Sequence, residues 1–234
     1  MEYGIILGII IIAFIIIAWA LQIKTKEFKE LKSLGFDKEL RKEVDSYPDN
    51  ETVCKEMLKM LENEDVKIKI DEEGKERTSI YMVATNTIWI ANIEDTFTRI
   101  QTIAHECIHS MQNKTTLWFQ FLFSCIYPIY FIVISILTIL GKIQHPMIQV
   151  VLLLVMGIIF FTVRSYVEME AMLKARNLAE KYMNTKKSVT EETKNVILSG
   201  YDIINRIGIK MSLVQLWIKP ILRVVVYCTI VMIM

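Results

Sequence analysis

The sequence has almost no net charge, because 27 lysine and arginine residues are balanced by 26 aspartate and glutamate residues. A nucleic-acid-binding protein needs a surplus of basic side chains to contact phosphates, so this balance argues against nucleic acid as a partner. The cysteines are few and have no pairwise spacing, and two of them lie in apolar runs: Cys54, Cys107, Cys125 and Cys228. This distribution excludes a secreted disulfide scaffold.

Hydrophobic residues, in contrast, make up 53% of the chain and give it a mean hydropathy of +0.37. A soluble domain of this length rarely needs so many, so we expect membrane-spanning helices. Residues 4–23 form a nearly unbroken apolar run, and about 20 helical residues cross a ~30 Å hydrocarbon core. Ala18-Trp19-Ala20 resembles a signal-peptide cleavage site. The length of the run and the lack of a positive charge before it favour a retained anchor.

Two further apolar runs, residues 117–140 and 147–163, are joined by a short connector and predict a transmembrane hairpin. Pro128 is a possible kink in the first of them. The tail, residues 213–234, is apolar but interrupted by Lys219, Pro220 and Arg223. It is either a further span, with its basic side chains reaching the inner surface, or an interfacial helix.

A run of basic residues from Lys24 to Lys42 follows the first apolar segment and, by the positive-inside rule, places that flank in the cytoplasm. The expected fold class is an α-helical membrane protein with about four transmembrane segments and a small cytosolic α+β domain. We expect it to be a multi-pass protein of the plasma membrane, in contact with the lipid bilayer. The predicted segments are an N-terminal anchor (1–23), a cytosolic α+β region (24–116), a transmembrane hairpin (117–163), a cytosolic helical region (164–212) and a C-terminal apolar segment (213–234).

Within the first cytosolic region the pattern of apolar residues predicts three helices and three strands. Asp49 or Asn50 is a plausible N-cap for the second helix. The first two strands are joined around Gly74. The predicted helices are 37–44, 50–61 and 95–113, and the predicted strands are 66–70, 78–84 and 87–93.

The last of these helices carries His105-Glu106-Cys107-Ile108-His109. Histidines four residues apart project from one helix face and bind a single zinc ion through neutral imidazole nitrogens. Glu106 lies about 100° around the helix, where it can reach a zinc-bound water whose pKa the metal lowers toward ~7, and can act as general base. The alternative is a coincidental pair of histidines on one helix face. Cys107 points away from the histidines and is expected to be a core residue.

A catalytic zinc site needs a third protein ligand and keeps its fourth position for water. The predicted topology excludes His145, because it places the hairpin turn on the opposite side of the membrane. Glu168 and Glu170 both follow the hairpin on the cytoplasmic side. Glu168 is favoured, because Ala171, Ala175 and Ala179 follow it at helical spacing and would let its face approach another helix closely. Glu170 points away and is expected to be solvated.

The motif 105–112, the hairpin, and then Val167-Glu168-Met169-Glu170-Ala171 resemble the bacterial membrane neutral zinc metallopeptidases (YugP-like), which are gluzincins in the style of the HtpX and CAAX-prenyl proteases. The resemblance implies a gluzincin-like domain with one Zn²⁺ per chain, held by His105, His109 and Glu168, and Glu106 as catalytic base. It also places Lys174 where the family usually has an arginine. Ile108 and Met172 depart from the family pattern without removing a ligand.

The resemblance further implies an edge strand that pairs with an extended, membrane-associated peptide or protein substrate. Ile88, Trp89 and Ile90 could form this edge, or could equally belong to an ordinary core strand. The candidate donors to the oxyanion are Tyr166, Lys174 and Arg176, and the sequence does not choose among them. The expected function is hydrolysis of peptide bonds at the cytoplasmic membrane surface. The alternatives are a site-2-type intramembrane protease and a catalytically degenerate zinc-binding membrane protein that acts by interaction.

Overall fold

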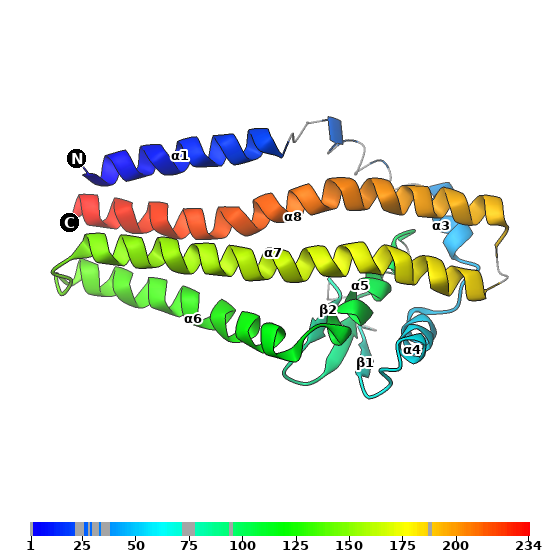
Figure 1. Ribbon diagram of the computed structural model, residues 1–234. Helices are drawn as coiled ribbons and strands as arrows, with labels where there is room; N and C mark the ends of the chain where they lie inside the picture. The colour runs from blue at the N-terminus through cyan, green and yellow to red at the C-terminus, as the bar shows by residue number, and fades with distance from the viewer. Residues whose placement is uncertain are drawn as a thin grey trace. The chain divides into compact units, whose positions relative to one another are not determined.

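The computed structural model describes residues 2–21, 26–27, 29, 33, 38–71, 78–93, 96–186 and 189–234. It is mostly helical and has one small three-stranded sheet (Figure 1). The chain divides into two compact units. The first consists of Met1–Ile23, Trp118–Tyr166 and Lys210–Met234, and the second of Lys24–Leu117 and Val167–Ile209.

The first unit contains most of the apolar sequence. Three helices of the described chain are long and apolar enough to cross a membrane: α6 (Lys114–Ile139), α7 (Pro146–Thr185) and α8 (Glu191–Ile233). The tail, residues 213–234, follows α8 to its end at Ile233 and so belongs to one of these three helices. The N-terminal helix α1 (Glu2–Ala20) is apolar but shorter, and its membrane crossing stays a prediction.

The helices of this unit pack closely and are also linked by hydrogen bonds. Pro128 lies inside α6 without ending it. The Tyr127 hydroxyl donates to the Leu153 carbonyl at 3.1 Å. A Cβ atom on Gly157 would lie 2.8 Å from the Pro220 Cβ, so the glycine is needed for the approach of α7 and α8 here. The hairpin connector turns at Gly141, whose φ of 65° suits glycine.

The second unit contains two short helices, α3 (Lys38–Val44) and α4 (Asn50–Met60), followed by the sheet and α5 (Arg99–Met111). Asp49 is the N-cap of α4, because its carboxylate accepts from the Thr52 backbone N–H at 2.9 Å. The predicted helix starts at 37 and 95, and the turn around Gly74, lie outside the described residues. Helix α5 itself begins at Arg99, four residues later than the sequence predicts, and shortly before it the Thr96 N–H donates to Ile93 O.

The sheet corrects one expectation. Its strands are β1 (Lys67–Ile70), β2 (Ile80–Met82) and β3 (Thr87–Ile90), in the order β1-β3-β2. Strand β3 pairs with β1 in parallel and with β2 in antiparallel orientation. Ile88, Trp89 and Ile90 therefore belong to the central strand: Ile88 and Trp89 have partners in both β1 and β2, and Ile90 has a partner in β1. The expectation that they form a free edge is wrong, and the alternative of a core strand holds: Ile88 and Ile90 are fully buried.

Helix α5 is held on both sides within this unit. Near its start, the buried Arg99 guanidinium donates to the carbonyls of Val44, Tyr47 and Pro48 at 2.7–2.9 Å, which ties α5 to the loop before α4. The stripe of Ala171, Ala175 and Ala179 on α7 is completely buried in the same core cluster as Ile103, Ala104 and Cys107 of α5. Small side chains on α7 allow this close approach, as the sequence predicts.

Candidate metal centre

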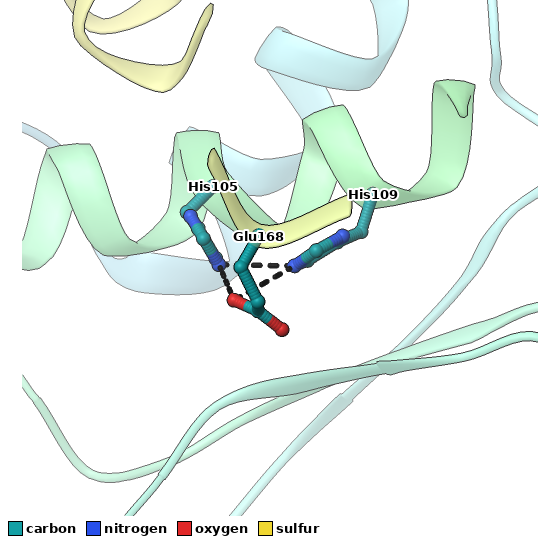
Figure 2. Close-up of side chains that lie close together, drawn as sticks. All are labelled: His105, His109 and Glu168. Carbon is teal, nitrogen blue, oxygen red and sulfur yellow. Dashed lines mark hydrogen bonds and ion pairs between the residues drawn. The ribbon is translucent and has the colours of Figure 1, made fainter. Parts of the chain in front are cut away.

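Two histidines of α5 and one glutamate of α7 point toward one another (Figure 2). Nε2 of His105 lies 3.0 Å from Nε2 of His109, one helical turn further on. The Glu168 carboxylate completes the group, with Oε2 at 3.4 Å from the His105 Nε2 and 3.8 Å from the His109 Nε2. The three residues are only about one-tenth to one-fifth exposed at their side chains. The structure thus brings together the set that the sequence predicts, with Glu168 rather than Glu170.

The separations suit a tetrahedral metal ion. Ligand atoms at 2.0–2.1 Å from a tetrahedrally coordinated zinc lie about 3.3 Å from one another. The three separations of 3.0, 3.4 and 3.8 Å bracket that value. Without a cation or an extra proton, two imidazole lone pairs and a carboxylate oxygen at such distances repel one another. The group can therefore hold a metal ion, and its donor atoms alone do not say which one.

The orientation of His109 is fixed by a hydrogen bond to a side-chain amide. Its Nδ1 lies 2.7 Å from Oε1 of Gln112, three residues further along the chain. Burial lowers the pKa of His109, but its hydrogen bond to Glu168 and the charges of Glu106 and Glu168 outweigh burial and leave the pKa above its usual value. A proton and a metal ion thus compete for Nε2 of His109, since a histidine binds a metal ion as the neutral imidazole.

Glu106 is buried beside the two histidines, as a general base in this motif would be. Its Oε2 accepts the backbone N–H of Tyr81 in β2 at 2.6 Å. Burial raises the pKa of the Glu106 carboxyl, and the neighbouring His105 and His109 oppose this rise. Strand β2 therefore holds the carboxylate in place, and the sequence reveals nothing of this contact because it joins two elements through a backbone group.

Glu170 is not simply solvated, which corrects a second expectation. It accepts a hydrogen bond from the Gln112 amide at 2.9 Å and from the Lys174 ammonium at 2.6 Å. The hydrogen bond and charge of Lys174 hold the pKa of the Glu170 carboxyl below its usual value. No sequence pattern indicates this contact, because Gln112 directly follows the end of α5 and lies 58 residues before Glu170.

The other predicted residues are placed elsewhere. Lys174 pairs with Glu170, and Arg176 pairs with Asp202 at 2.9 Å and with Glu180, so both cations have carboxylate partners of their own. Tyr166 belongs to the first unit and is 60% exposed. None of these three is thereby singled out as an oxyanion donor. His145 is an exposed residue of the connector between α6 and α7. Cys107 is buried, as predicted, with its sulfur 3.8 Å from that of Cys54.

Comparison with known proteins adds no relative to this picture: no family model, curated protein or solved structure matches the chain.

Proposed function

We propose that this protein is a membrane-bound zinc metallopeptidase that hydrolyses peptide bonds at the cytoplasmic surface of the plasma membrane, as the resemblance to the YugP-like gluzincins implies. It would bind one Zn²⁺ per chain, through His105, His109 and Glu168, with Glu106 as general base. The observation that carries the proposal is the convergence of the three ligand atoms next to a buried glutamate.

The donor set favours zinc but does not by itself require it. Two imidazoles and one carboxylate suit catalytic zinc, and they also suit the iron of non-haem oxygenases. The position of Glu106 is the feature that favours hydrolysis. It directly follows the first histidine on the same helix and is buried beside both. An iron oxygenase has no use for a general base held at this point, whereas hydrolysis does.

Bound zinc would supply a Lewis acid that polarises a peptide carbonyl and makes water acidic enough to deprotonate near neutral pH. The chain's own residues supply the rest. Glu106 accepts a proton at its carboxylate, and the Tyr81 N–H keeps that carboxylate beside the histidines. As a general base Glu106 would take the proton of the attacking water and pass it on to the leaving amine.

The membrane surface is the proposed location because both ligand helices lie close in sequence to apolar runs. Glu168 follows the end of the predicted span at residue 163 within about one and a half turns of the continuous helix α7. His109 precedes the apolar run at residue 117 by little more than two turns. A substrate that is itself associated with the membrane fits this location.

The predicted topology has a direct test at the hairpin connector. A cysteine introduced at His145 in a cysteine-free background should react with a membrane-impermeant maleimide added to intact cells. A cysteine introduced at Glu192, an exposed residue of α8, should react only after the membrane is opened. The reverse pattern would place the metal centre outside the cytoplasm.

Metal removal tests the proposed function itself. Full-length protein purified without chelators should contain about one zinc per chain and cleave casein or a membrane-protein substrate. Treatment with 1,10-phenanthroline should abolish cleavage, and added Zn²⁺ should restore it. Protein that contains zinc but cleaves neither substrate would favour the degenerate, interaction-only alternative. Iron in place of zinc would argue for an oxygenase.

A further inference from the structure

The geometry points to Gln112 as a positioning residue that fixes His109 for metal binding and ties the two ligand-bearing helices together. The side chain of Gln112 makes three hydrogen bonds, and the residue is 8% exposed. Its Oε1 faces the Nδ1 of His109, while its Nε2 donates to the Val167 carbonyl at 2.8 Å and to the Glu170 carboxylate at 2.9 Å. This inference rests on the proposed metal centre, but its test has a readout that needs no metal.

The orientation of the amide follows from its partners on α7. A carbonyl and a carboxylate can only accept hydrogen bonds, so the NH₂ group of Gln112 must face them. The amide oxygen must then face His109. Because that oxygen can only accept, Nδ1 of His109 must carry the proton. The Nε2 of a neutral His109 is therefore a bare lone pair that faces His105 and Glu168, which is the state that a metal ion requires.

Glu170 secures this chain of contacts from the far end. Its second oxygen accepts from Lys174, four residues further along α7, so the carboxylate that holds the amide is itself held. The contacts run from His109 through Gln112 to Glu170 and Lys174. The Val167 carbonyl, bonded to the same amide, directly precedes Glu168, so one side chain sets the position of ligands on both helices.

The chain offers a closely matched control at Asn205. This amide is also 8% exposed and also donates to a backbone carbonyl of α7, that of Met172, at 3.2 Å. Its oxygen accepts from Gln101 at 2.5 Å rather than from a histidine. Asn205→Leu therefore removes a buried side-chain amide that is hydrogen-bonded to α7, and Asn205 contacts none of the three ligand residues through these bonds.

The first measurement compares affinities for Co²⁺, a spectroscopic substitute for zinc, in full-length protein in detergent. Gln112→Met should weaken binding about 10- to 100-fold and alter the visible absorption of the bound cobalt. Asn205→Leu should stay within about threefold of the wild type. Equal losses in Gln112→Met and Asn205→Leu, or no loss in Gln112→Met, would overturn the assignment.

The second measurement reads the tautomer of His109 in metal-free wild-type protein, above the imidazole pKa. The chain has 3 histidines, so ¹⁵N-histidine labelling gives few signals, and His145→Gln identifies the connector residue. We expect one of the remaining two to carry its proton on Nδ1 and to lose this preference in Gln112→Met. A wild-type His109 protonated on Nε2 would overturn the inference whether or not the variants fold. Failure of the wild type to bind any metal would instead contradict the proposed function and leave the tautomer result to decide the role of Gln112.

Discussion

Glu106→Gln should leave the metal in place and lower peptide hydrolysis by about 10²- to 10⁴-fold, the usual contribution of a general base. Glutamine has nearly the same shape and retains an oxygen that can accept from the Tyr81 N–H, so the buried contact between α5 and β2 survives. What it loses is the ability to take a proton. Zinc content and the initial rate of casein cleavage, measured on the same preparations, check this prediction.

The matched control is Glu192→Gln, the same substitution at an exposed carboxylate in the first turn of α8. Its zinc content and rate should equal those of the wild type. If Glu106→Gln cleaves casein as fast as the wild type, Glu106 is not the base and the mechanism proposed above is wrong. If it loses zinc as well as activity, Glu106 contributes to the structure of the site rather than to proton transfer.

Glu168→Gln should reduce zinc affinity by about two orders of magnitude or more, whereas Glu170→Gln should reduce it only a few-fold. In the first variant a neutral amide replaces an anionic ligand whose oxygen lies 3.4 and 3.8 Å from the two imidazole nitrogens. In the second, the new side chain still offers an oxygen to the Gln112 amide. Competition with a zinc chelator of known affinity gives both values.

This pair also tests the choice between two carboxylates that lie two positions apart in the sequence. Helical geometry places them on different faces of α7, so the two variants should behave very differently. A larger loss in Glu170→Gln than in Glu168→Gln would mean that α7 is rotated in the loaded protein and that Glu170 is the ligand.

Residues that share one helix account for most of what the sequence predicts about the site. The spacing of His105 and His109 requires only that α5 be a helix, which it is. The preference for Glu168 required one more step, the inference that the alanine stripe marks a packed face of α7. The complete burial of Ala171, Ala175 and Ala179 bears out that step. In both cases local periodicity carries the information.

Contacts between distant elements were not predictable in this way. Gln112 and Glu170 are 58 residues apart in sequence, and nothing in the periodicity of either helix pairs them. The sheet order is a second example. Strand β3 pairs in parallel with β1, although β2 lies between them in the sequence, and three short strands contain no local signal for that choice.

The length of α7 was not predictable either, because the helix continues through residue 163 to Thr185. Hydrophobicity marks where a helix leaves a membrane, not where the helix ends.

The central claim is that His105, His109 and Glu168 hold a zinc ion, and X-ray absorption at the zinc edge of the purified full-length protein tests it most directly. We expect nitrogen and oxygen neighbours only, at about 2.0–2.1 Å, with the outer-shell signature of two imidazole rings. Sulfur neighbours near about 2.3 Å would place the metal at cysteine residues such as the neighbouring Cys54 and Cys107 instead. That spectrum, or a protein that retains no zinc at all, would contradict the account.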